Sequence, residues 1–352
     1  MARETFPFTS STLRSLRLQR EWLEWEDRRR AAAQQCRSRR CPSSPRAQLT
    51  RPHRSCRDPA VHHALFSGDL QQVQALFQDE EAANMIVETV SNQLAWSAEQ
   101  GFWVLTPKTK QTAPLAITTA RGYTDCARHL IRQGAELDAR VGGRAALHEA
   151  CARAQLDCVR LLLTFGAKAN VLTEEGMTPL HLCTIPESLH CANGCGGLAE
   201  LLLRHGARAE VPNGAGHTPM DCALQAVQDA PNWEPEVLFA ALLDYGAQPV
   251  RPEMLKHCAN FPRALEVLLN AYPCVPSCET WVEAVLPELW KEHEAFYSSA
   301  LCMVNQPRRL QHLARLAVRA QLGSRCRQGA TRLPLPPLLR DYLLLCVEGR
   351  IQ

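Results

Sequence analysis

The stretch that decides the fold is residues 145–167, which read AALHEACARAQLDCVRLLLTFGA. It opens with an Ala-Ala-Leu-His marker at 145–148 and closes with the apolar triplet 161–163 followed by Gly166-Ala167. Glycine adopts the left-handed backbone conformation just past a helix end at little cost, so Gly166 predicts a helix stop. The stretch therefore predicts a unit made of a turn, a helix, a short loop, a second helix and a glycine stop.

Both markers recur along the chain. The closing Gly-Ala pair occurs at 134–135, 166–167, 206–207 and 246–247. The opening marker is cleanest in Thr178-Pro179-Leu180-His181, close in Thr218-Pro219-Met220-Asp221, and degenerate at 113–116 and 145–148. Threonine at the N-cap followed by proline at N1 favours a helix start, because proline lacks the amide hydrogen that would be left unbonded there. Successive opening markers are spaced by 32 residues and then by 33.

This pattern resembles the ankyrin repeat, whose period is about 33 residues. The resemblance is specific for residues 113–250 and implies an all-α solenoid in which neighbouring units bury one another's apolar faces. Residues 58–112 are interpreted as one or more degenerate N-terminal repeats, although 80–112 fit no clean unit. Residues 251–306 have helical periodicity and are interpreted as a capping repeat with connecting helices.

The third unit, residues 178–210, is irregular. Its opening marker and the next one are 40 residues apart, and counting from the two ends places the second helix in two incompatible registers. One hypothesis is a splice junction that joins two repeats between residues 192 and 193, in which case a longer transcript would encode whole units there. The other is an insertion of seven residues in a loop. The sequence leaves both open.

Charge is concentrated at the N-terminus. Residues 1–57 contain fourteen arginines and five acidic residues, a net charge of +9, whereas the whole chain carries +3. Such an arm can bind RNA, an anionic membrane or an acidic partner. We favour a flexible, solvated arm, and salt-dependent binding by the isolated arm would support the nucleic-acid alternative.

Composition excludes several protein classes. No apolar run approaches the ~18 residues of a membrane span, and no signal peptide is evident. The sixteen cysteines are scattered and include no Cys-x-x-Cys pair, so we expect reduced thiols, no zinc RING and an intracellular protein. Cys151, Cys183 and Cys222 occupy positions where a repeat buries a small residue. We expect a cytoplasmic location, with the nucleus as the second candidate compartment.

The C-terminal residues 307–352 carry a second pattern. Leu310, Leu313, Ala314, Ala317 and Val318 share one face of a predicted helix, and the arginines 308, 309, 315 and 319 are expected to be solvated on the other. A loop, the segment Leu333-Pro334-Leu335-Pro336 and a second apolar helix follow. A terminal helical hairpin would fit this pattern alone, but the two halves together resemble a SOCS box.

The resemblance identifies the chain as a member of the ankyrin-and-SOCS-box family. It implies that Leu310, Leu313, Ala314 and Val318 bind elongin C within the elongin B–elongin C pair. It also implies that Leu333 to Pro336 bind a cullin, the fifth by box type, which brings a RING protein. Ala314 replaces the usual cysteine of the elongin-binding element. The implied function is substrate recognition for a ubiquitin ligase, without catalysis by this chain.

Other functions fit the sequence less well than substrate recognition for a ubiquitin ligase. The chain has no Gly-x-x-x-x-Gly-Lys, zinc-protease or serine-hydrolase motif. Gly194-x-Gly196-x-x-Ala199 matches a loose dinucleotide fingerprint but follows no predicted strand, so we expect neither an enzyme nor a cofactor. His148 and His181 are expected to make buried turn hydrogen bonds. The principal alternative is an ankyrin scaffold or signalling adaptor that transfers no ubiquitin. The target is unknown, and the candidates for binding it lie at repeat turns: Arg144, Glu174, Glu175 and Asn213.

Overall fold

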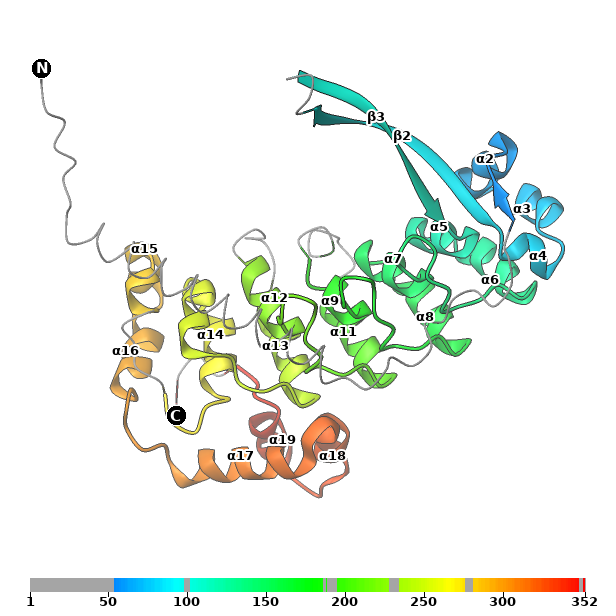
Figure 1. Ribbon diagram of the computed structural model, residues 1–352. Coiled ribbons are helices and arrows are strands. Elements are labelled where there is room, and N and C mark those ends of the chain that lie inside the picture. Colours follow the sequence, from blue (N-terminus) through cyan, green and yellow to red (C-terminus); the bar gives the residue numbers. More distant parts are fainter. Residues whose placement is uncertain are drawn as a thin grey trace, which may run out of the picture.

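The computed structural model describes residues 54–97, 102–185, 188, 195–227, 234–275, 281–347 and 351. Most of the basic arm and the proposed joint at 192/193 lie outside these residues. Helices stack in pairs along a curved array, and the C-terminal helices pack below its far end (Figure 1). The predicted all-α class is confirmed, since helices dominate the described residues; a single three-stranded sheet accompanies them.

The stack begins with α2 (Pro59–Ser67) and α3 (Leu70–Leu76), followed by the short α4 (Glu80–Ala83). The central pairs are α5 (Pro114–Arg121) with α6 (Thr124–Arg132), α7 (Ala146–Ala152) with α8 (Leu156–Thr164), α9 (Pro179–Leu182) with α11 (Cys195–Arg204), and α12 (Pro219–Ala226) with α13 (Pro235–Asp244). Beyond them lie η2 (Pro252–Cys258), α14 (Pro262–Leu269), η3 (Val282–Ala284), α15 (Pro287–Glu292) and α16 (Glu294–Cys302). No helix in the described residues is long and apolar enough to cross a membrane.

The Gly-Ala pairs end the second helix of each unit as predicted. Gly134, Gly166, Gly206 and Gly246 all have positive φ, between 87° and 94°. The alanine after each glycine donates its backbone N–H to the carbonyl five residues earlier, as in Ala167 to Leu162 at 3.0 Å. This is the Schellman bond, which satisfies a carbonyl that the helix would otherwise leave unpaired. The same alanines are buried and contribute to one continuous apolar core.

The marker histidines connect neighbouring units. The backbone N–H of Ala145 donates to His148 Nδ1 at 3.1 Å, and His148 Nε2 lies 2.9 Å from the carbonyl of Val171 in the next turn. His181 repeats this arrangement with Thr178 and with the carbonyl of His217. Both rings are fully buried. The predicted turn hydrogen bonds are therefore confirmed, and they tie each helix start to the following repeat.

These histidines should make the protein acid-sensitive. Burial lowers the pKa of His148 and of His181 from 6.5 to about 4. The unfolded chain therefore binds more protons than the folded one between these values, and stability is lost as the pH falls through that window. Each ring lowers the free energy of unfolding by up to about 1.4 kcal/mol per pH unit. Urea unfolding at pH 7.5 and 5.0 measures the slope.

His181→Gln should reduce that slope, whereas the matched change at the exposed His63 should leave it unchanged. If stability changed equally with pH in the native chain and in both variants, acid sensitivity could not be attributed to His181.

A long β-hairpin occupies most of the segment that fitted no clean repeat. Strand β2 (Ile86–Ser97) pairs antiparallel with β3 (Phe102–Thr112), and β1 (Ser55–Cys56) adds two parallel residues at the base. The hairpin leaves the stack between the first two helical pairs and projects away from it (Figure 1). The described residues 80–97 and 102–112 thus form a short helix and two paired strands, and they contain no second helical pair.

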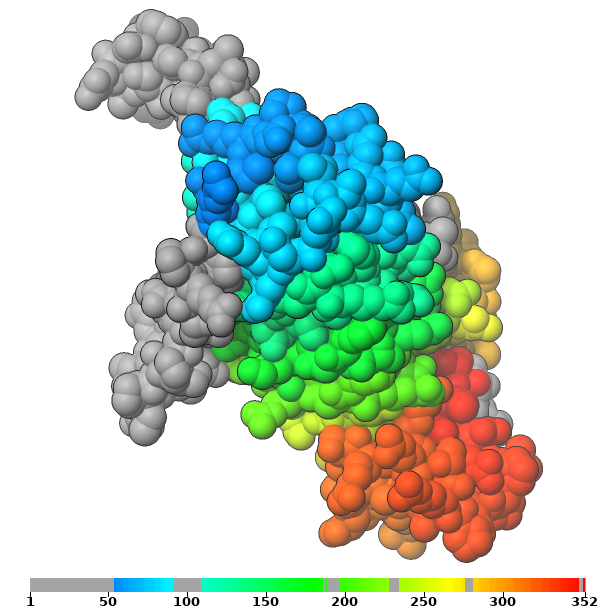
Figure 2. All heavy atoms as spheres, turned by 90° about the vertical axis from the view of Figure 1, so that its right-hand side faces the viewer, coloured from blue at the N-terminus to red at the C-terminus, as the bar shows by residue number. Residues whose placement is uncertain are grey.

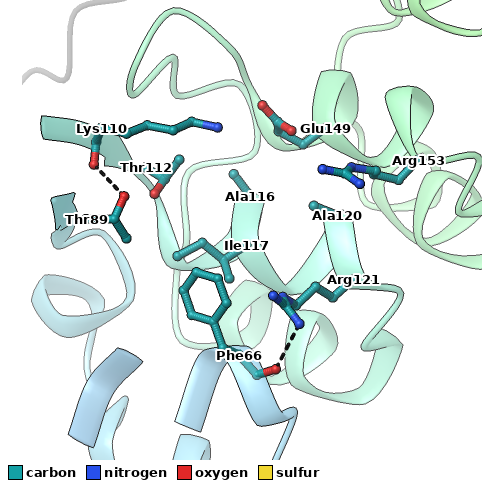
Figure 3. A pocket seen from close by; sticks show the side chains of 10 residues that line it. All are labelled: Phe66, Thr89, Lys110, Thr112, Ala116, Ile117, Ala120, Arg121, Glu149 and Arg153. Atoms are coloured by element: carbon teal, nitrogen blue, oxygen red, sulfur yellow. Dashed lines mark hydrogen bonds between the residues drawn. The ribbon is translucent and has the colours of Figure 1, made fainter. Parts of the chain in front are cut away.

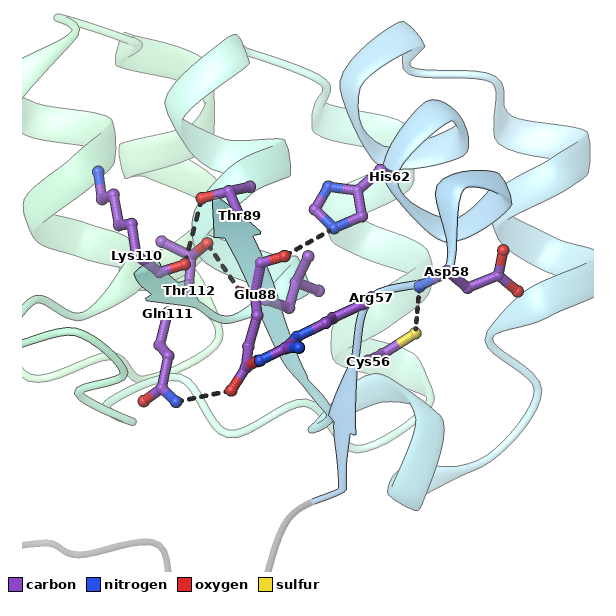
Figure 4. Close-up of polar contacts among 10 residues, drawn as sticks. Cys56, Arg57, Asp58, His62, Glu88, Thr89, Lys110, Gln111 and Thr112 are labelled. Carbon is purple, nitrogen blue, oxygen red and sulfur yellow. Dashed lines mark hydrogen bonds and ion pairs between the residues drawn. The ribbon is translucent and has the colours of Figure 1, made fainter. Parts of the chain in front are cut away.

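Polar contacts fix the base of the hairpin (Figure 4). Glu88 accepts from Arg57 Nε at 2.8 Å and from Gln111 Nε2 at 2.9 Å, and these partners hold the pKa of its carboxyl below the ordinary value. Thr89 Oγ1 donates to the carbonyl of Lys110 at 3.1 Å. Val87 is fully buried. The base of the hairpin is therefore part of the folded stack.

Candidate docking surfaces

The C-terminal box consists of α17 (Leu310–Leu322), η4 (Gly323–Arg325), α18 (Cys326–Arg332) and α19 (Pro337–Leu343). Seen from the N-terminal end of the stack, the box forms an orange and red lobe beneath the green repeats (Figure 2). Its η4 contacts α13 of the stack, and Gly246, just after α13, lies close to Ser324 of η4. The box is thus a separate module that rests on the last ankyrin units.

The predicted apolar stripe of α17 faces solvent. Leu310 is 84% exposed, Leu313 38% and Val318 39%. Ala314 and Ala317 on the same face are also exposed. Large aliphatic side chains in water have a free-energy cost of roughly 1.5–3 kcal/mol each relative to burial, so an exposed row of them marks a binding surface.

The prediction for the opposite face was wrong. Arg308 and Arg315 are buried, at 4% and 6% exposure, and the side chain of Arg319 is 9% exposed. Only Arg309 of the four arginines remains in solvent. Helix α17 therefore packs its basic face on the repeat stack and presents its apolar face outward. The physical reason is that oxygens replace water around these guanidinium groups: Asn270 and Asp244 of the stack accept from Arg308 and Arg319, and the carbonyl of Tyr342 within the box accepts from Arg315.

His312 organises this basic face. Its Nδ1 accepts from Arg308 Nη2 at 3.1 Å and from Arg315 Nη2 at 2.8 Å, while Nε2 lies 2.8 Å from the carbonyl of Tyr272. Arg308 also donates to Asn270 Oδ1 at 2.9 Å. Burial, together with the two guanidinium charges, lowers the pKa of His312 to about 4 and keeps the ring neutral. A neutral imidazole can accept from both arginines.

The strongest link between box and stack is an ion pair. Arg319 Nη1 lies 2.8 Å from Asp244 Oδ1 at the end of α13 and donates to the carbonyl of Leu343 in α19. The Asp244 side chain is 3% exposed. Burial raises the pKa of the Asp244 carboxyl, although Arg319 opposes that effect. Arg319 thus connects the last full ankyrin unit with α17 and α19 of the box.

The Leu-Pro-Leu-Pro segment lies between α18 and α19. Pro334 and Pro336 are exposed, whereas Leu333 and Leu335 are half-buried. Leu333 and Pro336 have extended backbone, with ψ of 137° and 149°. Arg340 Nη2 donates to the carbonyl of Leu335 at 3.4 Å. The backbone N–H of Leu335 donates to the carbonyl of Leu333 at 2.8 Å, so the segment turns tightly at Pro334 and presents its two prolines to solvent. Next to it, Leu338 and Leu339 are 83% and 44% exposed; their apolar character was evident, but the sequence did not reveal their exposure.

The four predicted target-binding residues lie on three successive repeat turns. Glu174 and Glu175 are exposed, and the Glu174 side chain lies beside Gly143 of the preceding turn. Arg144 is half-buried, 3.9 Å from Glu149. Asn213 instead stabilises its own turn, since its Oδ1 accepts from the backbone of Ala215 and of His217.

Sequence reasoning missed a cavity at the base of the hairpin (Figure 3). Its volume is about 580 Å³, and its walls come from β2, β3, α2, α5 and α7. The lining residues are Phe66, Thr89, Lys110, Thr112, Ala116, Ile117, Ala120, Arg121, Glu149 and Arg153. The richness of residues 86–90 in β-branched side chains was an available strand signal. The cavity depends on contacts between distant segments, which no local pattern reports.

Cysteine positions are partly as predicted. Cys151 and Cys183 are buried, but Cys222 is half-buried because its helix position lies closer to the surface. Burial raises the pKa of Cys183, which keeps it a thiol. Among the described residues no group of histidine, cysteine or acidic side chains could hold a metal ion.

A helical-repeat stack that ends in an outward-facing apolar helix defines a protein-binding adaptor with two docking surfaces. The SOCS box family matches residues 306–344, and ankyrin repeats (3 copies) match residues 46–171 and 114–213. The chain is 74% identical to human (Homo sapiens) ankyrin repeat and SOCS box protein 16 and 68% identical to the mouse (Mus musculus) protein of that name, with full coverage of both chains in each case. Human ankyrin repeat and SOCS box protein 18 is 31% identical over 83% of this chain and 88% of its own length. The chain belongs to the ankyrin repeat and SOCS box family.

The alignment with the human relative also bears on the irregular third unit. It spans 453 positions and includes all 352 residues of this chain, so 101 positions have no counterpart here. That number corresponds to about three ankyrin units of 33 residues. A splice junction that removes whole repeats predicts such a deficit. A seven-residue loop insertion predicts none.

Proposed function

We propose that this protein is the substrate-recognition subunit of an elongin–cullin–RING ubiquitin ligase. The observation that carries the proposal is the orientation of α17. Its basic face is fixed to the ankyrin stack, and its aliphatic face, with Leu310 at 84% exposure, is left in solvent. A row of aliphatic side chains at i, i+3, i+4 and i+8 suits recognition of a helix in an apolar groove.

Each docking surface has a distinct role in this proposal. Leu310, Leu313, Ala314 and Val318 would bind elongin C, which is paired with elongin B. The segment Leu333 to Pro336 would contact the cullin, the fifth by box type, and its proline-restricted backbone has little conformational entropy to lose on binding. Residues 54–275 would hold the target protein.

The chain itself would contribute proximity and no chemistry. A RING protein on the cullin would bring the charged conjugating enzyme, and holding the target beside it raises the effective concentration of the target's lysines. The buried ion pair between Asp244 and Arg319 supports this role, because it restricts motion between the target-binding and ligase-binding modules. We place this activity in the cytoplasm, with the nucleus as the second compartment.

Co-purification tests the proposal. The full chain, expressed with elongins B and C, should form a stable ternary complex, and a chain that ends at residue 306 should lose both elongins. Recruitment of a cullin by the full chain but not by a Pro334→Ala/Pro336→Ala variant would support the second surface. A full chain that captures no elongin would leave the alternative, an ankyrin scaffold without ubiquitin transfer.

A further inference from the structure

The far end of the β-hairpin has an apolar patch on one face. Side chains alternate between the two faces of a strand, so the register of β2 and β3 places alternate residues of each strand on the same face. On one of these faces Leu94 lies opposite Leu105, and Trp96 lies opposite Trp103. These four residues are here called the hairpin patch. The charged residue of this face is Glu88, at the base, so the patch itself is neutral.

The hairpin carries this face away from the repeat stack (Figure 1). Nearer the base, Val90 on the same face is 58% exposed, and Thr109 and Gln111 are also exposed. At about 3.4 Å per residue, the hairpin patch lies roughly 24–31 Å beyond the buried Val87. Cross-strand aromatic pairs stabilise a hairpin, but a two-stranded sheet has no second layer to cover them and is marginally stable by itself. The patch is therefore a surface that a partner would complete.

The other face and the outer edge of the hairpin are less suited to such a partner. Thr89 and Lys110, on the opposite face, line the cavity together with residues of α5 and α7, so that face is turned toward the stack. The edge strand β3 contains Pro107 between lysines 108 and 110, and proline and lysine discourage pairing with a further strand. A partner of the hairpin patch would therefore pack on its face and would not extend the sheet.

We propose that the hairpin patch packs against the same patch of a second copy of this chain, so that the protein forms a two-fold symmetric dimer. The patch consists of a leucine row and a tryptophan row about 7 Å apart along the hairpin. Half a turn about an axis between the rows places the tryptophan row of one copy over the leucine row of the other. The two hairpins then point in opposite directions, which keeps the two stacks apart.

The area of the hairpin patch is sufficient for such a dimer. The two tryptophans and two leucines would bury roughly 500–700 Å² per copy, at about 150–250 Å² for each aromatic side chain and about 100 Å² for each leucine. Two copies together would bury about 1,000–1,400 Å², which reaches the ~1,000 Å² expected of a specific interface. The inference does not depend on the proposed function, because the hairpin and the box lie at opposite ends of the stack (Figure 1).

Other occupants fit the hairpin patch less well. The chain's own N-terminal arm carries a net charge of +9 over residues 1–57, and the carboxylate on this face, Glu88, already pairs with Arg57 (Figure 4). A membrane would first meet Glu99, which lies between the two strands in the sequence, and a carboxylate is costly to place in lipid. A neutral apolar patch neither attracts a charged partner nor repels its own copy.

Sedimentation equilibrium of the purified full chain over a range of concentrations tests this inference. It is measured with and without elongins B and C, because the exposed stripe of α17 could itself associate copies in their absence. We expect a dimer in both cases, and added salt should not weaken it, because the interface is neutral. The double variant Trp96→Thr/Trp103→Thr retains residues that favour strands, and it should raise the dissociation constant of the dimer about 100-fold or more.

The double variant Phe102→Thr/Val104→Thr is the matched control, because it replaces two apolar residues of the same strand on the opposite face. It should leave the dissociation constant unchanged, and thermal melting should show that the stack is folded in both variants. A chain that stays monomeric, a dimer that survives the tryptophan variant, or one that the control weakens equally would overturn the inference. So would a dimer that salt dissociates, which would indicate the basic arm, or one that elongins abolish, which would indicate α17. A monomeric chain that sediments with lipid vesicles would assign the patch to a membrane instead.

Discussion

Replacing Leu310 by alanine should weaken binding to the elongin B–elongin C pair by ten-fold to about 150-fold. The side chain is 84% exposed in the free protein, so nearly all of its apolar surface is available for burial in a partner. Full burial of a leucine contributes roughly 1.5–3 kcal/mol, and each 1.4 kcal/mol changes the dissociation constant tenfold. Because Leu310 contacts little in its own chain, the variant should fold as stably as the native protein.

Calorimetric titration of the purified full chain with elongins B and C measures this effect. Leu286→Ala is the matched control, since Leu286 is 55% exposed but lies before α15, away from the box. It should change elongin affinity by less than about twofold. A Leu310→Ala chain that binds elongins as tightly as the native chain would refute the assignment of α17 as the elongin-binding helix.

The sequence predicted those features of the fold that depend on local chemistry. Gly166 and its three equivalents end helices, because a left-handed residue is required wherever a Schellman bond closes a helix. Pro179 and Pro219 begin helices at N1. His148 and His181 make the turn bonds that their place in the marker implies. In each case the relevant partners lie within a few residues or in the adjacent repeat.

Features that depend on distant segments could not be predicted in this way. The sequence of α17 defines an apolar face and a basic face, but it does not say which face meets the stack. That choice depends on Asp244, Asn270 and the carbonyl of Tyr272, which lie 40 or more residues before their partners in most cases. An isolated arginine is ordinarily solvated, and it is buried here because those oxygens replace water.

The cavity at the base of the hairpin could not be predicted from the sequence for a related reason. Phe66, Lys110 and Arg153 come from three segments that lie far apart in the chain, and each alone has an ordinary surface role. The predicted contact residue Asn213 uses the Oδ1 of its side chain within its own turn. A position in a repeat turn predicts that a residue lies near a ligand. Whether its side chain can contact that ligand depends on the hydrogen bonds that it makes within its own fold.

Replacing Arg319 by alanine should have the largest effect on stability. Its guanidinium pairs with Asp244 at 2.8 Å, and both side chains are almost fully buried, at 9% and 3% exposure. Removing one partner of a buried ion pair costs about 3–5 kcal/mol, because the other charge is left without water or a counter-charge. The protein should melt at a lower temperature, and amide hydrogens in α13 and α17 should exchange faster, while those in α7 should change little.

The pH dependence of this loss distinguishes an uncompensated carboxylate from simple loss of packing. Burial already raises the pKa of Asp244, and removal of Arg319 raises it further. An acid with a raised pKa in the folded state destabilises the protein as the pH rises through that pKa. The difference in stability between Arg319→Ala and the native chain should therefore shrink as the pH falls, and taking this difference cancels the histidine contribution.

Combining Asp244→Leu with Arg319→Met should restore much of the lost stability, because two apolar side chains then fill the space without a buried charge. A double variant as unstable as Arg319→Ala would instead assign the loss to the other contact of this side chain, the hydrogen bond to the carbonyl of Leu343. If the double variant is stable and still captures elongins, the ion pair serves to orient the box on the stack and is not required for either module to fold.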